Sequence, residues 1–404
     1  MKTGATSKRT ELLADTLSPL IRFFDESNWA SRFGDPDVCD FTIGNPHDMP
    51  LSAFVDALKK WSTPKDKYWY AYKRNEPSAQ IVVAESLRNS HGLPFEPEDV
   101  FLTNGATAAL GVVLAAIIDP GDQVIFVSPP WFQYEAMILN AGGVPVRTKV
   151  DMRTLDLNPG AIEAAINERT RAVIINSPHN PTGRIYPPGV LEPLAKMMSV
   201  ASERYGRTIY LISDEAYRKI IYDGRQYHSP VTFYNNSFLI YTYGKALVAP
   251  GQRIGYIAMP PGMEHREQFR NTIPVLQMVN GWAFPNALLQ HSLADLDVIS
   301  VDVVHLQAKR DKLVGALREM GYETTLPEGT FYVIVRSPLP DDQAFIDLLA
   351  EYNIFCVPGS LMEIPGYFRI CLTASDEMIE RSLPGFALAM ERANEMKSAA
   401  PVYG

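Results

Sequence analysis

Cysteine is scarce in this chain, and its scarcity limits the chemistry to be expected. The 404 residues include three cysteines, Cys39, Cys356 and Cys371, an odd number at wide separations. Their spacing fits neither a metal site nor a disulfide framework. Reduced thiols in a cytoplasmic protein, with no bound metal, are the simplest interpretation.

Long hydrophobic runs are missing as well. The longest apolar stretch, Ala108 to Asp119, is too short to span a bilayer and predicts a buried helix instead. Residues 1–17 lack the continuous apolar core and the small-residue cleavage site of a secretory signal. The sequence therefore predicts no membrane association.

Positive charge is in deficit. The formal net charge is -9 and no block of like charges occurs, whereas nucleic acids and anionic membranes bind clustered cations. Neither is an expected partner. A hydrophobic fraction of 46% with 21% charged residues is typical of a folded globular protein, and the length allows two domains with a large core.

The alternation of apolar runs and helix-length segments indicates the fold class, because no internal repeat or low-complexity linker marks a boundary. Between about Asp99 and Met259 the runs are DVFLTN, QVIFVSP, VPVRTKV, RAVIINSP, TIYLISDE, SFLIYTYG and GYIAMP. Consecutive apolar residues of this kind predict an open α/β fold with a seven-stranded, mostly parallel sheet covered on both faces. Ligands of such sheets gather at the carboxyl ends of the strands.

A smaller α+β unit is expected after this sheet. A long helical pattern in VVHLQAKRDKLVGALREMGY is followed by TFYVIV, IFCVPG and YFRICLT. The segment LSPLIRFFDES near the start is an amphipathic helix with no core of its own. We therefore expect a large domain over residues 50–295 and a small domain built from residues 1–49 and 296–404.

Small and aromatic residues follow the first two of these strands. Gly105 and Thr107 come after VFLTN at the start of a helix, where free backbone N–H groups suit a phosphate. An ordinary N-cap by Thr107 explains the same residues. Trp131 follows QVIFVSPP, where its ring could stack on a planar ligand or pack into the core.

An amide, a carboxylate and an amine follow three later strands. Asn180 precedes a proline and also suits a simple turn. Asp214 directly follows buried strand residues and needs a partner, because an unpaired buried charge is costly; Glu215 is compatible with a solvated position. Lys245 lies in TYGKALVAPGQRIGY, where a solvated loop lysine is the alternative. No single one of these residues identifies a class of site, but the order in which they follow the strands does.

This order resembles the pyridoxal-phosphate enzymes of fold type I, and among them the class I and II aminotransferases. The resemblance runs from about Gly44 to Arg369 and is based on NSPHNPTG, SDEAY and GKALVAPGQRIGY. The last segment fits the lysine motif of that family, in which Lys245 is followed by Gly251, Arg253 and Gly255 at the family's spacing.

The resemblance implies a site for pyridoxal 5'-phosphate. Lys245 would form an imine with the aldehyde, and Asp214 would accept the proton of the pyridine nitrogen so that the ring can draw electrons. Tyr217 and Asn180 would hydrogen-bond the ring hydroxyl, and Trp131 would stack on the ring.

The resemblance also implies contacts to the phosphate. These would come from Gly105, Ala106, Thr107, Thr242 and Arg253, the last through a charge-assisted contact. Tyr70 of a second subunit would reach the same phosphate, with Tyr72 as the competing choice. A homodimer with shared sites is therefore implied.

Substrate contacts are implied near both ends of the chain. Arg369 in GYFRICLTAS would grip the substrate α-carboxylate in a bidentate fork. Gly44 would lie beside that carboxylate, and Asn180 would share the site. His47 is not a general feature of the family; it either touches substrate or is a local turn partner.

Three residues depart from the pattern of the family. His179 stands where asparagine is frequent, Gly244 where serine is frequent, and Asn75 where glycine is usual after Tyr70. These departures bear on specificity more than on the cofactor.

The function implied is transfer of the α-amino group of an amino acid to a 2-oxo acid, through the lysine imine and a quinonoid intermediate. The same residues could instead serve an amino-acid oxidase, a decarboxylase or a lyase, because the orientation of the breaking bond decides the outcome. A non-catalytic ligand sensor is the third hypothesis. No second arginine for a dicarboxylate substrate is evident between Gln277 and Asn286, where Trp282 and Phe284 suggest either an apolar lining or core packing.

Overall fold

A single open sheet forms the centre of the computed structural model, which describes residues 5–282 and 284–399. The strand order is β2-β8-β7-β6-β5-β3-β4. β8 is antiparallel to its neighbours β2 and β7, and the other pairs are parallel. The predicted seven-stranded, mostly parallel sheet is therefore confirmed. Its strands are β2 (Val100–Thr103), β3 (Gln123–Ser128), β4 (Val144–Lys149), β5 (Thr170–Asn176), β6 (Tyr210–Asp214), β7 (Ser237–Thr242) and β8 (Gly255–Ala258).

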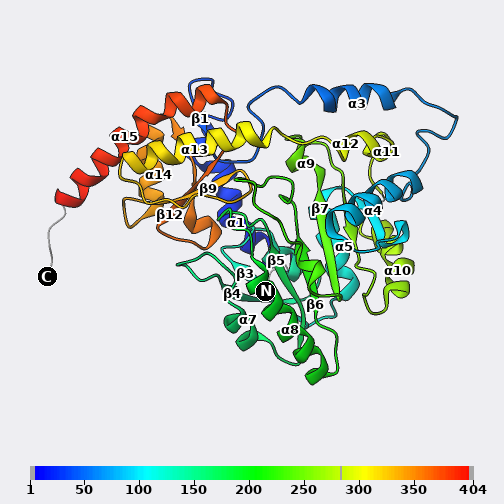
Figure 1. Ribbon diagram of the computed structural model, residues 1–404. Helices are drawn as coiled ribbons and strands as arrows, with labels where there is room; N and C mark the ends of the chain where they lie inside the picture. The colour runs from blue at the N-terminus through cyan, green and yellow to red at the C-terminus, as the bar shows by residue number, and fades with distance from the viewer. Residues whose placement is uncertain (1–4, 283, 400–404) are drawn as a thin grey trace.

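Helices cover both faces of this sheet (Figure 1). In β3, Val124 and Phe126 belong to one core cluster with α5 and α10, whereas Ile125 and Val127 belong to another with α8. Alternate residues of a strand point to opposite faces, so a continuous apolar run fills two cores. The helices around the sheet are α3 (Ser52–Ser62), α4 (Pro77–His91), α5 (Gly105–Ile117), α6 (Tyr134–Asn140), α7 (Pro159–Ala165), α8 (Pro188–Tyr205), α9 (Tyr243–Ala246), α10 (Arg266–Val279), α11 (Ala287–His291) and α12 (Leu293–Leu296), with short 3-10 turns at Pro97–Asp99 and Pro230–Thr232.

Sequence signals explain the ends of two of these helices. α4 and α8 begin with Pro77 and Pro188, whose fixed φ suits a first helical position. They end before Gly92 and Gly206, which have φ of 68° and 58°. This left-handed conformation favours glycine and closes the last helical turn.

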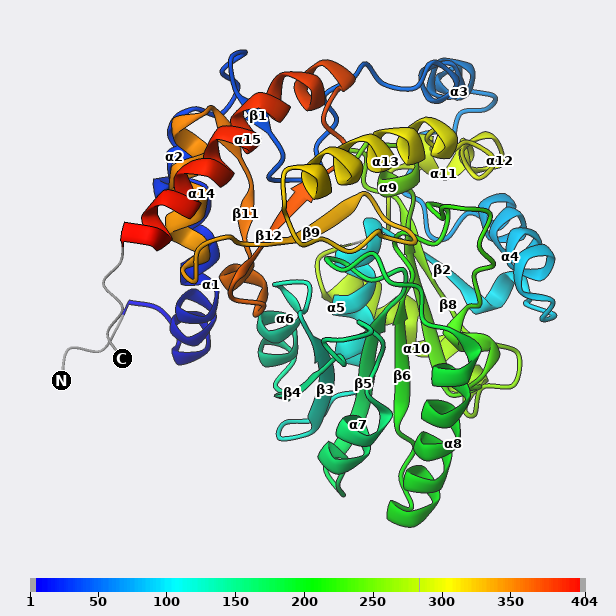
Figure 2. The ribbon, with the colours of Figure 1, turned by 60° about the vertical axis from the view of Figure 1, so that its left-hand side comes forward.

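A second, smaller sheet lies at one end of the large one (Figure 2). Its order is β11-β12-β9, with antiparallel pairs. A separate parallel pair joins β1 near the start of the chain to β10 near its end. The elements are β1 (Cys39–Asp40), β9 (Tyr332–Arg336), β10 (Ile354–Phe355), β11 (Val357–Pro358), β12 (Tyr367–Cys371), α13 (Val303–Glu319), α14 (Asp342–Glu351), α15 (Asp376–Ala399) and the 3-10 turn Gly359–Met362.

The first two helices link these two parts. α1 (Lys8–Glu26) packs against α6, while α2 (Asn28–Ser31) packs against α14. Phe23 and Trp29 belong to the same core cluster as Val127 and Phe355. The N-terminal segment therefore contacts the large sheet as well as the smaller unit, and the domain boundaries given above stay a prediction. Among the described helices, none is both long and apolar enough to cross a membrane.

Gly255 is required by close packing at the start of β8. A Cβ atom there would lie 2.3 Å from the Tyr241 carbonyl oxygen and 2.9 Å from the Gly105 Cα. We expect Gly255→Ala to destabilise the fold by about 1–3 kcal/mol, because backbone atoms cannot move aside cheaply. The free energy of unfolding in urea measures the effect.

Gly315 in α13 is the matched control, since a Cβ atom there would meet no other atom within 4 Å. Gly315→Ala should stabilise the protein by up to about 1 kcal/mol, because alanine favours a helix more than glycine does. Equal stability of the two variants would contradict the close approach at Gly255.

Candidate active site

The carboxyl ends of the strands enclose a cavity of about 240 Å³. Residues following β2, β3, β5, β6 and β7 line it, together with residues from the smaller unit. The structure thus brings together most of the residues singled out in the sequence. Those that line the cavity are Gly44, Ala106, Thr107, Trp131, Asn180, Asp214, Tyr217, Thr242, Lys245, Arg253 and Arg369.

Asp214 is the carboxylate of this cavity. It is buried at the end of β6, and its Oδ2 accepts a hydrogen bond from the Tyr134 hydroxyl at 2.6 Å. The backbone N–H of Ala216 donates to Oδ1 at 3.2 Å. Burial raises the pKa of Asp214, while these two hydrogen bonds and the charge of Lys245 oppose that rise. Asp214 thus needs a cationic partner to be stable in its ionised form.

A chain of hydrogen bonds connects Asp214 to Arg369. Asn176 donates from Nδ2 to the Asp214 carbonyl oxygen at 2.8 Å and accepts the Asn180 backbone N–H at 2.7 Å. Arg369 donates from Nη1 to Asn180 Oδ1 at 3.2 Å and from Nη2 to the Thr42 carbonyl at 2.9 Å. These contacts fix the position of the guanidinium.

Arg369 keeps an unused donor. Its Nε is buried without a hydrogen-bond partner in the described part of the chain. The guanidinium carbon lies 4.2 Å from the ring centroid of Tyr332, which supports the group by a cation–π contact. A buried N–H without an acceptor is costly, and a carboxylate ligand would satisfy it.

A second group of residues forms a cradle at the start of α5. Gly105 has φ of 79°, and a Cβ atom there would lie 2.7 Å from Arg253 Nη2 and 3.3 Å from Thr242 Oγ1. α5 begins at Gly105 and its N-cap residue, Asn104, makes no side-chain cap hydrogen bond. Thr107 therefore lies inside the first turn and is not the N-cap. The exposed N–H groups of this turn, with Arg253 beside them, suit an anion.

Lys245 lies in α9 and lines the cavity. Its Nζ is 5.7 Å from the ring centroid of Tyr217 and 5.6 Å from that of Phe331. A position between two buried rings differs from that of a solvated loop lysine, which was the alternative from the sequence. Tyr217 is itself buried, which raises its pKa well above the usual range, and its hydroxyl lies 3.4 Å from that of Tyr332.

The charges of the cavity are unbalanced. The cationic lining residues are Lys245, Arg253 and Arg369, and the single anionic one among the described lining residues is Asp214. None of the three cations forms an ion pair with another described residue. A cavity with this excess positive charge is built for anionic ligands.

Other residues from the sequence lie outside this cavity. His47 borders a neighbouring cavity of about 160 Å³, where its Nε2 is buried without a partner in the described chain. The Tyr70 side chain is turned toward Ser62, whose carbonyl accepts a hydrogen bond from its hydroxyl, and Tyr72 is fully exposed. Trp282 does not line the cavity, and its carbonyl accepts a hydrogen bond from Asn104 at 2.7 Å. Ala283 lies outside the described residues.

The three departures from the family pattern take local roles. His179 is buried and its Nδ1 lies 2.8 Å from the Thr182 hydroxyl; burial lowers its pKa to about 4. Asn75 accepts the Leu102 backbone N–H at 2.7 Å. Gly244 lines the cavity, and a Cβ atom there would lie 3.2 Å from Pro250 Cα.

Sequence reasoning missed Asn176 and Tyr332 as parts of the site. It noted Tyr134 as an aromatic residue after a strand but missed its hydrogen bond to Asp214, because these contacts join segments far apart in the chain. It was also wrong about Glu215, which is fully buried. Successive strand residues point to opposite faces, so the residue after a cavity-facing aspartate points into the core. In residues 5–282 and 284–399, no cluster of histidine, cysteine or acidic residues is arranged to hold a metal ion.

Comparison with known proteins identifies the family. The model of the family "aminotransferase class I and II" matches residues 36–384. The chain belongs to the class I and II aminotransferases. The family, the fold type and an enzyme that transfers amino groups were all predicted from the sequence, and these predictions are confirmed. Enzymes of this family depend in general on pyridoxal phosphate.

Individual relatives of this aminotransferase agree with that assignment. The aspartate/prephenate aminotransferase of Thermus thermophilus is 31% identical over 364 residues, which cover 88% of this chain and 92% of the relative. A crystal structure of an aminotransferase from Eubacterium rectale matches with a TM-score of 0.85 and 29% identity, covering 97% of each chain. The Thermus thermophilus aspartate aminotransferase with maleate matches with a TM-score of 0.81 and 26% identity, covering 96% of this chain and 100% of the other.

The raised pKa of Asp214 predicts that its charge destabilises the cofactor-free aminotransferase. A carboxyl whose pKa is higher in the folded state than in the unfolded state weakens folding at high pH. This effect declines as the pH falls through the folded-state pKa and is absent below the unfolded-state pKa. Cofactor-free Asp214→Asn should therefore melt at a higher temperature than wild type near neutral pH and lose this advantage in acid. Circular dichroism during heating measures both temperatures.

Asp223 provides a control of opposite sign. Its pKa is lowered, chiefly by the hydrogen bonds from Arg310, the closest at 2.7 Å. Asp223→Asn should lower the melting temperature at neutral pH, and its deficit should shrink in acid. If Asp214→Asn behaves in the same way as Asp223→Asn, the burial argument for Asp214 is wrong.

Proposed function

We propose that this chain binds pyridoxal 5'-phosphate in the 240 Å³ cavity and uses it to transfer the α-amino group of an amino acid to a 2-oxo acid. One observation carries the proposal. Three cations without ion-pair partners in the described chain line the same cavity as one buried carboxylate at the strand ends. A phosphate would match Arg253, a substrate carboxylate would match Arg369, and a protonated ring nitrogen would match Asp214, which leaves Lys245 as the amine that reacts with the cofactor aldehyde.

The cradle at Gly105 fits a phosphate. A Cβ atom on Gly105 would lie 2.7 Å from Arg253 Nη2, so another residue here would displace the guanidinium, and the φ of 79° itself favours glycine. We infer that the N–H groups of the first turn of α5, together with Thr107, Thr242 and Arg253, hold the phosphate by charge-assisted hydrogen bonds.

The opposite end of the site fits the cofactor ring. When bound, pyridoxal phosphate supplies an aldehyde that reacts with amines and a ring that withdraws electrons from the substrate α-carbon. Asp214 would accept the hydrogen bond of the ring nitrogen, which would relieve the cost of its buried charge. Tyr217, neutral because of its raised pKa, would donate to the ring oxygen. Trp131 would cover one face of the ring, and Asn180 would reach its oxygen from the side of Arg369.

Two residues would act on the amino acid. Arg369 would bind the α-carboxylate, satisfying its orphaned Nε. Gly44 lies at the same end of the cavity, where a Cβ atom would come within 2.8 Å of Phe331. Lys245 would accept the α-proton on Nζ and return it, since it lies in the cavity between the rings of Tyr217 and Phe331.

The amino donor is proposed to carry an uncharged, apolar side chain. The remaining described lining includes Ile43, Leu110 and Phe132 and holds no cation beyond the three already assigned. The names of similar relatives include aspartate, whose second carboxylate would find no counter-ion here. Its burial without a partner would be costly.

A homodimer and a cytoplasmic location are part of this proposal. The rings of Tyr68, Tyr70 and Tyr72 are exposed and outside the cavity of their own chain, so a second copy is where Tyr70 would meet a phosphate. The three cysteines are buried as thiols, which suits a reducing compartment. Because His47 lies outside the cavity, no oxidase or other second activity is proposed.

Variants of Lys245 and Arg369 test the assignment. Lys245→Ala should abolish turnover and remove the visible absorption band of the lysine-bound cofactor. Arg369→Ala should raise KM for the amino acid by about 100-fold, the loss expected for a buried bidentate ion pair, while Kd for the cofactor changes little. Retention of the band in Lys245→Ala, or equal losses of both affinities in Arg369→Ala, would contradict the roles given.

A panel of amino donors tests the substrate class. With wild-type enzyme, leucine or phenylalanine should give kcat/KM at least about tenfold above that of aspartate, because binding aspartate would bury an unpaired charge. The change of cofactor absorption in a half-reaction measures each rate. A preference for aspartate would show that a cation from elsewhere, such as a second copy, completes the site.

A further inference from the structure

The strand end and turn from Asp214 to Arg218 present their side chains to two different environments. Asp214 and Tyr217 line the cavity, whereas Glu215 and Arg218 are buried on the other side of the stretch. The backbone N–H of Glu215 donates to the Ile240 carbonyl on β7, and that of Arg218 donates to the Glu215 carbonyl. The contacts of these two buried side chains therefore help to fix the backbone segment that carries Asp214 and Tyr217.

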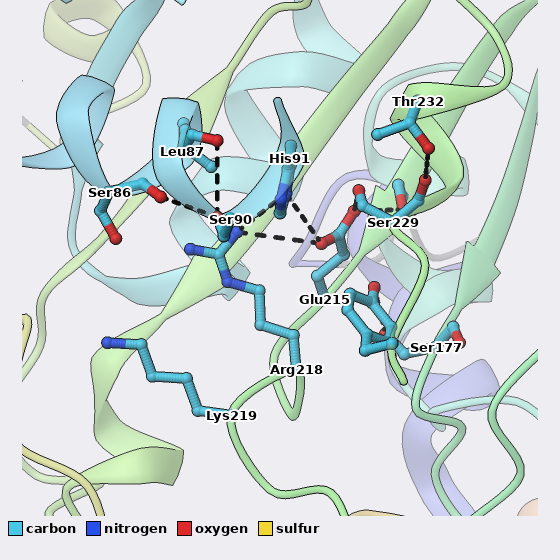
Figure 3. A network of polar contacts seen from close by, with 12 residues as sticks. Ser86, Leu87, Ser90, His91, Ser177, Glu215, Arg218, Lys219, Ser229 and Thr232 are labelled. Carbon is cyan, nitrogen blue, oxygen red and sulfur yellow. Dashed lines mark hydrogen bonds and ion pairs between the residues drawn. The ribbon is translucent and has the colours of Figure 1, made fainter. Parts of the chain in front are cut away.

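The two carboxylate oxygens of Glu215 have different partners: one accepts hydrogen bonds and the other faces Arg218 and His91 (Figure 3). Its Oε1 accepts hydrogen bonds from the hydroxyls of Ser213 at 3.0 Å and Ser229 at 2.5 Å. Its Oε2 has no hydrogen-bond partner in the described chain and lies 3.9 Å from both Arg218 Nη1 and His91 Nε2. The attraction to Arg218 is thus a direct charge interaction at close range.

Arg218 is fixed by aromatic groups as well as by charge. Its Nη2 donates to the Tyr256 hydroxyl at 2.5 Å, and its guanidinium carbon lies 4.6 Å from the ring centroid of Tyr241. Nη1 lies 3.3 Å from His91 Nε2, which accepts a hydrogen bond when the ring is neutral. The charge of Glu215, the two hydrogen-bond partners and the aromatic ring together fix the position of this guanidinium.

The other groups near the pair do not change charge around neutral pH. Burial and the charge of Arg218 lower the pKa of His91 to about 4, so its ring is neutral. Burial raises the pKa of Tyr227, Tyr241 and Tyr256. Lys219, the remaining nearby cation, is paired with Asp297 at 3.5 Å. Burial raises the pKa of Glu215 itself, whereas the charge of Arg218 and the hydrogen bonds from Ser229 and Ser213 oppose that rise and favour the ionised form that pairs with Arg218.

We propose that Glu215 and Arg218 are positioning residues. Their ion pair, which His91 also contacts, holds Asp214 and Tyr217 in place. Because the two charges cancel, the pair also places no net charge near the cofactor ring. This role rests on the function proposed above. Neither residue lines the cavity, so both act through their neighbours.

Single charge removals test the electrostatic part of this role. Glu215→Gln leaves Arg218 uncompensated, which should lower the pH midpoint of the visible band of the lysine-bound cofactor. Arg218→Met leaves Glu215 uncompensated and should raise it. Shifts of about one pH unit are expected for one charge at an effective dielectric constant of about 20. The double variant should return the midpoint toward that of wild type.

Rate measurements test the positioning part. Each single variant should lose about tenfold in kcat with KM changed by less than about twofold, because the residues act on the reacting groups and not on substrate binding. The control is Asp99→Asn, which breaks a buried pair with Arg270 (2.7 Å) at the opposite end of β2 and should leave the pH midpoint unchanged.

Each outcome is decisive. The proposal is overturned if the pH midpoints of both single variants move in the same direction. It is also overturned if both remain equal to the midpoint of the Asp99→Asn control. If Arg218→Met does not fold, Arg218→Lys keeps the charge and should match the wild-type midpoint, while Glu215→Gln still lowers it. Absence of a visible band from the wild type itself would instead overturn the proposed function.

Discussion

Excess positive charge at the ends of the strands is the constraint on which the rest of this structure depends. Lys245, Arg253 and Arg369 repel one another, and Asp214 offsets only part of their charge. Such an arrangement persists only where a rigid scaffold enforces it. The parallel sheet does so by delivering several residues to one edge from strands whose own side chains are buried.

The surrounding contacts hold each charge by a different means. Arg369 is fixed by two carbonyl-type acceptors and the ring of Tyr332. Asp214 is fixed by Tyr134 and by the backbone of Ala216. These contacts satisfy part of the hydrogen-bonding capacity of each group and leave the remainder for a ligand, which is a condition for binding without rearrangement.

The sequence predicts the sheet and the order of residues at its edge because both depend on local patterns. Apolar runs mark the strands, and Trp131, Asn180 and Lys245 each follow within four residues of the end of one of them. The partners Tyr134, Asn176 and Tyr332 depend on contacts across the fold, which no local pattern carries. Glu215 was expected in solvent because a charged residue usually is. Because successive residues of a strand point to opposite faces of the sheet, the residue after Asp214 is instead predicted to be buried.

Prediction from the sequence fails in the same way for segments whose positions depend on contacts with distant parts of the chain. The N-terminal helix α1 has an apolar face, but this pattern alone does not predict that α6 packs against it. Tyr70 was singled out by a resemblance that implies a contact with a second chain, so its place beside Ser62 within one chain could not be derived from that resemblance. His47 lies close in sequence to Gly44, yet a turn directs it into a different cavity.

The cradle at Gly105 has a practical consequence for handling the protein. Inorganic phosphate and sulfate resemble the cofactor phosphate that we propose for its N–H groups and Arg253, so under that proposal either anion would occupy the same place when the cofactor is absent. Mass action then makes the cofactor-free protein look more stable in phosphate buffer and makes cofactor affinity look weaker. Affinities and melting temperatures compared between buffers would differ for that reason alone.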